Sequence, residues 1–154
     1  RKAVALLEIL VNKQVQQTTQ EKQANTSSTS QTLFNLKLLA YERIILFIER
    51  IKPDSFIPRT LSPSLPYQEY QLLLINEIRK EFEYNLSQQL YLSENAWEVT
   101  VNFKDNIITL INSAATSCPP QATASDLARK ILEHYISSDL KGDQILKIVK
   151  AEIQ

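Results

Sequence analysis

Glutamate and arginine side chains recur in two helix-like segments and are the groups best suited to acid–base or ionic chemistry. Glu42-Arg43 and Glu49-Arg50 stand in one segment and Glu81 stands in another. A buried pocket that gathered these five side chains and shifted their pKa values would be a candidate enzyme site. An enzyme with a buried Glu/Arg pocket is therefore one of three functions that the sequence leaves open.

A dense polar run follows from Glu81 to Ser93. On a helix, Glu81, Asn85 and Gln88 would share one side, while Tyr84 and Gln88 would share another with Tyr91. Such a run is typical of an internal hydrogen-bonded network that joins two helices, or of a contact with a protein partner. The candidate residues for that network or contact are Glu42, Arg43, Glu49, Arg50, Glu81, Tyr84, Asn85, Gln88, Gln89, Tyr91 and Trp97.

Other catalytic and metal chemistry finds little support. His134 is the only histidine and Cys118 the only cysteine, and they stand on different predicted elements. A zinc site needs clustered ligands, and a nucleophile needs an oriented base beside it. Glu81 and Glu83 are two residues apart, so they would not face each other on a helix. We therefore predict no metal site, no cofactor, no catalytic residue and a protein that is not an enzyme.

Composition favours an all-α fold. The 154 residues fit one domain, and they include one glycine and six prolines, whereas hairpins and barrels usually need glycine where φ is positive. The 17 basic and 17 acidic side chains cancel, which argues against a nucleic-acid binder. Residues 1–52 nevertheless hold eight basic and four acidic side chains, which suits either an anionic membrane surface or a solvated helix face.

Three parts are expected along the chain. Residues 1–13 predict a membrane-proximal helical stem, because the apolar run 3–11 is too short to cross a bilayer. Residues 14–32 predict a flexible linker, because 15 of these 19 residues are Gln, Thr, Ser or Asn and bury little apolar area. Residues 33–154 predict a bundle of about four to five helices.

Hydrophobic spacing and breakers place the bundle helices. Pro53 should end the first helix, four prolines predict an extended connection after it, and Ser93 should cap a new helix. Ser93 would thus break one long helix into a hairpin, with Tyr91 and Trp97 near its tip. The expected helices span residues 33–52, 67–92, 94–117, 123–137 and 142–153.

Three stretches resemble an uncharacterised family of small Bacteroidota proteins. They are residues 38–51, residues 81–91, and Ser93 with Trp97. Members of that family typically have one N-terminal transmembrane helix, a short charged stem and a cytosolic helical domain. The resemblance covers about residues 33–115 and implies a membrane tether upstream of Arg1, but no activity. Members often have histidine where Tyr84 stands, and their stem is usually shorter than residues 14–32.

The leading hypothesis is a membrane-tethered interaction or scaffold module that binds a protein partner at the cytoplasmic face of the inner membrane. We expect its single-pass anchor to lie outside this chain, which starts at Arg1 and contains no methionine. The first alternative is a self-assembling structural protein that uses apolar stripes on both sides of residues 33–52. The second alternative is the enzyme with the Glu/Arg pocket.

Overall fold

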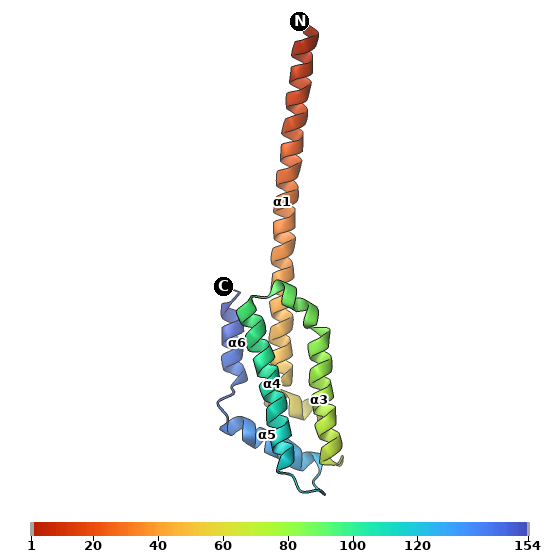
Figure 1. Cartoon of the computed structure of the whole chain (residues 1–154), viewed down its shortest axis with the longest axis vertical. Helices are drawn as coiled ribbons and strands as arrows, with labels where there is room; N and C mark the ends of the chain where they lie inside the picture. Colours follow the sequence, from red (N-terminus) through yellow and green to blue (C-terminus); the bar gives the residue numbers. More distant parts are fainter. Residues whose placement is uncertain (1, 154) are drawn as a thin grey trace. The chain divides into compact units, whose positions relative to one another are not determined.

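The computed structural model describes the backbone of residues 2–153 and the side chains of residues 4–17 and 26–153. Within residues 2–153 it has six α-helices, one 3₁₀-helix and no strand, which confirms the predicted all-α helical fold (Figure 1). Two compact units divide the chain, Arg1–Lys37 and Leu38–Gln154. The helices are α1 (Lys2–Ile51), α2 (Pro53–Thr60), α3 (Tyr67–Tyr84), η1 (Leu86–Tyr91), α4 (Glu94–Thr116), α5 (Ala124–Ser137) and α6 (Gly142–Ala151).

The first unit corrects the expected flexible linker. Residues 14–32 are α-helical and belong to α1. Residues 1–52 contain neither glycine nor proline, and glutamine is a good helix former, so nothing in this stretch blocks the helix. Polar side chains also bond along it: Thr32 Oγ1 donates to the Ser28 carbonyl at 2.9 Å, and Gln31 Nε2 donates to Asn35 Oδ1 at 3.3 Å. The polar composition therefore solvates the helix instead of breaking it.

The apolar start of α1 is exposed in this unit. Every large apolar side chain described there is more than half accessible to solvent, from Val4, at 60%, to Val15, at 59%. Among the described residues, no helix is both long enough and apolar enough to span a bilayer. The stretch is therefore an uncovered apolar surface of limited length.

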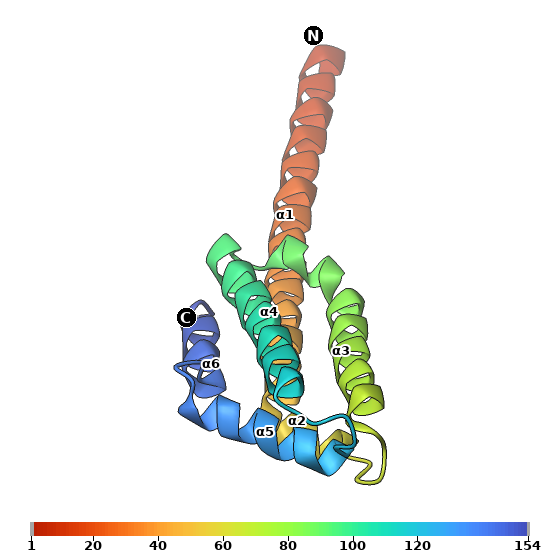
Figure 2. The ribbon, with the colours of Figure 1, turned by 60° about the horizontal axis from the view of Figure 1, so that its bottom comes forward.

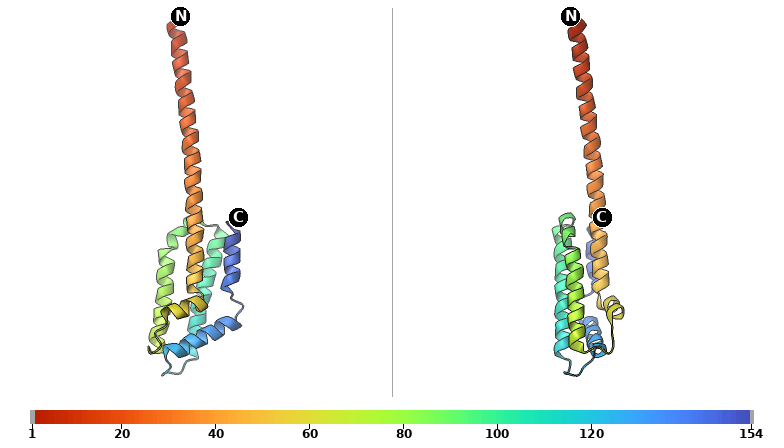
Figure 3. Two further views of the ribbon diagram at one scale, coloured as in Figure 1. Left: turned by 180° about the vertical axis from the view of Figure 1, so that it is seen from behind. Right: turned by 90° about the vertical axis from the view of Figure 1, so that its right-hand side faces the viewer.

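The second unit is built around the last turns of α1, together with α3 and α4. Figures 2 and 3 show these three segments side by side, with α5 across one end. The core packs α5 against α2, α3 and α4, and packs α6 against α4. Both apolar stripes of α1 point inward here, which explains why this helix is apolar on two sides. The buried members are Ala40, Tyr41, Ile44, Phe47, Ile48 and Ile51.

The proline-rich connection contains a helix that we did not predict. α1 ends at Ile51, just before Lys52 and Pro53, as expected, but Pro53 also starts α2. Proline is tolerated in a first helical turn because that N–H needs no intrahelical partner. Phe56 and Ile57 bury the inner face of α2, and Pro58 lies inside the helix. Burial of that apolar face explains how a short helix forms in a segment expected to be extended.

The hairpin at Ser93 is confirmed. α3 ends at Tyr84, earlier than predicted, and η1 continues to Tyr91. Ser93 Oγ then accepts a hydrogen bond from the Ala96 N–H at 3.0 Å and caps α4. The Ser93 N–H donates to the Tyr41 hydroxyl at 3.0 Å, which ties the turn to α1. Because α3 stops at Tyr84, Gln88 does not share a helix face with Glu81 as predicted.

A polar cluster, the Lys52 corner, joins the end of α1 to the two C-terminal helices, α5 and α6. Lys52 Nζ lies 3.0 Å from Asp143 Oδ1 and 3.2 Å from Glu49 Oε2, and the lysine side chain is only 10% exposed. Burial opposes the charged form, but the two hydrogen bonds outweigh it and raise the pKa of Lys52. The Gly142 N–H donates to the Tyr135 hydroxyl at 2.9 Å and completes the corner.

Candidate functional site

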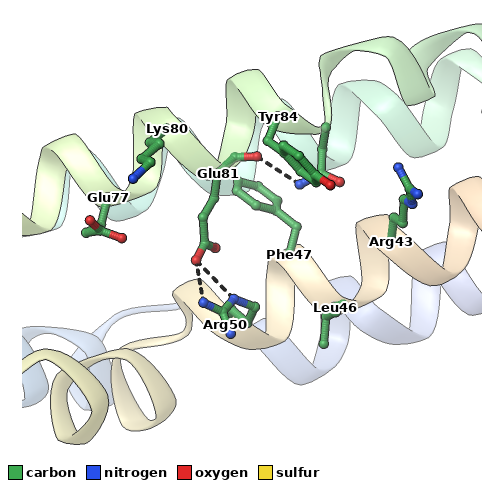
Figure 4. A pocket seen from close by; sticks show the side chains of 9 residues that line it. Arg43, Leu46, Phe47, Arg50, Glu77, Lys80, Glu81 and Tyr84 are labelled. Atoms are coloured by element: carbon green, nitrogen blue, oxygen red, sulfur yellow. Dashed lines mark hydrogen bonds and ion pairs between the residues drawn. The ribbon is translucent and has the colours of Figure 1, made fainter.

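A groove of about 460 Å³ lies between α1 and α3 (Figure 4). It belongs entirely to the second unit, and its size is in the range of ordinary ligand pockets. α1 supplies Arg43, Leu46, Phe47 and Arg50, while α3 and the residue after it supply Glu77, Lys80, Glu81, Tyr84 and Asn85.

Helix periodicity explains how these side chains meet. The four lining residues of α1 follow the spacing i, i+3, i+4, i+7, and so do the four of α3. That spacing defines one face of an α-helix, so each helix presents one continuous stripe to the groove. Asn85 extends the α3 stripe: its amide donates to the Glu81 carbonyl at 2.8 Å at the end of that helix.

One ion pair crosses the middle of the groove. Arg50 Nη2 and Nε lie 2.7 and 3.0 Å from the same oxygen, Oε1, of Glu81. Arg59, from α2, lies 3.8 Å from that oxygen and also donates to the Arg50 carbonyl at 3.0 Å. The hydrogen bond to Glu81 is the main reason why the pKa of Arg50 is raised. Glu81 is thus held by two guanidinium groups from neighbouring helices.

A row of three aromatic side chains begins at the groove and continues into the bundle. Phe47, which lines the groove, lies 6.0 Å from Phe82 between ring centroids, and Phe82 stacks on Trp97 at 5.4 Å. From α4, Lys104 Nζ lies 4.0 Å from the centre of the Phe82 ring. These contacts link α1, α3 and α4 through neighbouring aromatic rings, and such pairs stabilise the bundle beyond the area that they bury.

The groove also presents side chains that the fold does not use. Among the described residues, Arg43, Lys80 and Tyr84 form no side-chain hydrogen bond or ion pair. Tyr84 is 76% exposed and Leu46, which also lines the groove, is 58% exposed. In Figure 4, Arg43 lies at the Tyr84 end and Lys80 lies towards the Glu77 end. The groove therefore combines a closed centre with an open cationic end at Arg43 and an open end of mixed charge at Lys80 and Glu77.

Its chemistry suits recognition of a negatively charged group. Guanidinium binds carboxylate or phosphate through paired hydrogen bonds, and ammonium binds as a point charge. Glu81 is already engaged by Arg50, which leaves it poorly placed to accept a substrate proton. Among the described side chains, no group of three or more His, Cys, Asp or Glu is arranged to hold a metal ion.

The structure brings five of the eleven candidate residues together in this groove. The other six lie outside its lining. Among them, Glu49 pairs with Lys52, Trp97 stacks on Phe82, and Gln88 donates to Ser87 Oγ at 3.5 Å. The five that meet are Arg43, Arg50, Glu81, Tyr84 and Asn85; the six that do not are Glu42, Glu49, Gln88, Gln89, Tyr91 and Trp97.

Sequence reasoning missed five residues of the groove region. Leu46, Phe47, Glu77 and Lys80 line the groove, and Arg59 reaches the central ion pair. The first four share helix faces with residues that were singled out, so periodicity alone would have found them. Arg59 gave no such signal, because its segment was expected to be extended.

Comparison with known proteins gives one match. No curated protein and no solved structure matches the chain. A family model, described only as a family of unknown function, matches residues 2–154. That match covers nearly the whole sequence and agrees with the resemblance to an uncharacterised family. The chain therefore belongs to DUF7935, a family of unknown function.

Proposed function

We propose that this protein is a membrane-tethered interaction module, not an enzyme, and that its α1–α3 groove binds a protein partner at the cytoplasmic face of the inner membrane. The observation that carries the proposal is the open part of the groove. Arg43 has no partner among the described residues, and Leu46 and Tyr84, which line the same groove, are exposed. Arginine and tyrosine are among the residue types enriched in binding hot spots.

The membrane part of the proposal is supported by the first unit. Its exposed apolar stretch from Val4 to Val15 and its basic excess, five basic against two acidic side chains in residues 1–37, suit the surface of an anionic leaflet. The single-pass anchor outside this chain and the Bacteroidota origin come from the family resemblance and belong to the same proposal. Fractionation of the full-length protein tests them: recovery in the membrane pellet after carbonate extraction is expected, and recovery in the supernatant would contradict the tether.

Interaction is favoured over the two alternatives by where the relevant side chains lie. From Ala40 onwards, the apolar stripes of α1 proposed for self-assembly are buried within the bundle, as at Ile44 and Ile48, and only their first members, such as Leu33, are exposed. Two of the three glutamates proposed for an enzyme pocket, Glu42 and Glu49, do not line the groove, and Glu81 is held in an ion pair. A protein contact uses the exposed residues directly and needs no poised acid or base.

Site-specific photocrosslinking in native membranes tests the proposal. A benzophenone amino acid would replace Leu46 in the groove or, as a matched control, Leu72. Leu72 is 62% exposed on α3 and lies outside the groove lining. We expect one reproducible protein adduct from position 46, identified by mass spectrometry, and none from position 72. No adduct at position 46, or the same adducts from both positions, would contradict a partner in the groove.

A further inference from the structure

The charge of the groove is the first clue to what its partner presents. Three lining side chains are cationic, Arg43, Arg50 and Lys80, and two are anionic, Glu77 and Glu81. The lining therefore carries a net charge of +1, while the whole chain is neutral. Arg50 and Glu81 neutralise each other, and Arg59 adds a further positive charge 3.8 Å from Glu81. An acidic partner meets charge complementarity here, whereas a basic one does not.

The Arg43 end of the groove is the better site for an anion. In Figure 4, Arg43 lies by Tyr84 and away from Glu77. The Tyr84 hydroxyl is exposed and forms no hydrogen bond among the described residues, so it can donate alongside the guanidinium. A carboxylate that accepts from both groups gains two or three charge-assisted hydrogen bonds without breaking any contact of the fold.

The neighbouring surface is apolar. Leu46 lies three residues from Arg43 along α1, lines the same groove and is 58% exposed. A partner residue next to the carboxylate must cover Leu46 to exclude water, and an aliphatic side chain does so best. An α-helix places residues three or four apart on one face, which puts an acidic and an aliphatic side chain at this spacing.

The Lys80 end is a weaker second anchor. Lys80 forms no hydrogen bond or ion pair among the described residues, but Glu77 lies at the same end and opposes an incoming carboxylate. A second acidic residue of the partner, about two helical turns from the first, would reach this end. Loss of Lys80 should therefore weaken binding less than loss of Arg43.

We propose that the groove binds an acidic amphipathic helix of a partner protein, with a carboxylate on Arg43 and Tyr84 and an aliphatic side chain on Leu46. This proposal rests on the proposed function and adds the chemistry of the partner. Arg43 acts as the residue that selects acid over amide, because a guanidinium binds a carboxylate more strongly than a neutral carboxamide. Leu46 supplies apolar contact and no charge selection.

The test uses synthetic helical peptides and the full chain, with binding followed by fluorescence anisotropy. One probe peptide places glutamates about two turns apart with a leucine between them, and a second carries glutamine in place of each glutamate. We expect the acidic peptide to bind about tenfold more tightly than its glutamine version, as befits one charge-assisted contact. Arg43→Gln should abolish that preference, and Lys80→Gln should reduce it in part.

Arg79→Gln is the matched control, because Arg79 is exposed on α3, next to Lys80, and does not line the groove. Equal affinity for the two peptides, or an equal loss with Arg79→Gln and Arg43→Gln, would overturn the proposal. The proposal would also be overturned if the acidic peptide does not bind and Arg43 instead binds phosphatidylserine vesicles or a second copy of the chain. If the Leu46 adduct persists in such a case, the interaction function stands and only the acidic helix is wrong.

Discussion

The Lys52 corner and the α1–α3 groove contain the same kinds of charged side chain but differ in how many of their cations are paired. In the corner, Lys52 is nearly buried and pairs with both Glu49 and Asp143. In the groove, Arg43 and Lys80 are without a partner among the described residues, although carboxylates stand nearby. In the corner, charged side chains from elements far apart in the chain pair with one another. In the groove, two of the three cationic side chains are left free to pair with a partner.

This difference separates cations that stabilise the bundle from cations that can bind a partner. A buried cation must be paired, so removing contacts from the corner should destabilise the bundle. An exposed, unpaired cation contributes little to stability, so removing it should leave the fold intact and affect only binding.

The largest effect is expected from filling the corner. A Cβ at Gly142 would lie 2.3 Å from Lys52 Cδ and 3.0 Å from the Tyr135 hydroxyl. Gly142→Ala should therefore lower the free energy of unfolding by about 1–3 kcal/mol, as overpacking does. Urea unfolding measures it. Combining this change with Lys52→Ala should recover part of the loss. A simple sum of the two single losses would show that the two sites are not in contact.

A smaller effect is expected from the ion pair in the groove. Glu81→Gln keeps the shape of the side chain but removes the charge that Arg50 and Arg59 share. Because Arg50 is 43% exposed, water screens the pair, and the loss should be about 1 kcal/mol or less. Glu83→Gln is the control, since Glu83 is exposed on the same helix and lies outside the groove lining. An equal loss from both changes would deny the pair any specific role.

Alkaline pH should weaken the corner. The folded state raises the pKa of Lys52, through hydrogen bonds that outweigh burial, and raises that of Tyr135, mainly through burial. Both groups therefore hold their protons more tightly when folded. Their contribution is present at neutral pH and is lost as the pH rises above about 10. The urea midpoint should fall in that range, and less steeply in Lys52→Met. If the urea midpoint falls equally steeply with pH in the wild type and in Lys52→Met, the titration of Lys52 does not contribute to this loss of stability.

The smallest effect on stability is expected from the open end of the groove. Arg43→Gln removes a charge that has no partner among the described residues, and Leu46→Ser removes an exposed apolar side chain. Each should change the free energy of unfolding by no more than about 0.5 kcal/mol. A loss above about 1 kcal/mol, again from urea unfolding, would mean that this end is part of the structure and not a free surface.

The sequence predicted the elements whose ends carry a local chemical signal. Ser93 marked the start of α4 because its hydroxyl can satisfy a free N–H, and Pro53 marked the end of α1. The helix in residues 14–32 was missed because low apolar content was read as disorder, although no residue there breaks a helix. α2 was missed because burial of Phe56 and Ile57 outweighs the prolines, and burial is a tertiary effect.

The groove could be predicted only in part for the same reason. Arg50 and Glu81 were singled out by type, and their meeting follows from two amphipathic helices placed side by side. The role of Lys52 gave no signal, because Asp143 and Gly142 lie about ninety residues away in sequence and only the folded chain joins them. Contacts between distant segments depend on packing that no short pattern encodes.

The most direct test compares stability and partner capture in one variant of the full-length protein. Arg43→Glu reverses the charge at the open end of the groove, and Arg79→Glu makes the same change outside it. Arg43→Glu should unfold at the wild-type urea midpoint and lose the adduct formed from position 46 in native membranes, while Arg79→Glu keeps both. Capture that survives Arg43→Glu, or is lost only together with stability, would contradict the account of the groove as a binding surface.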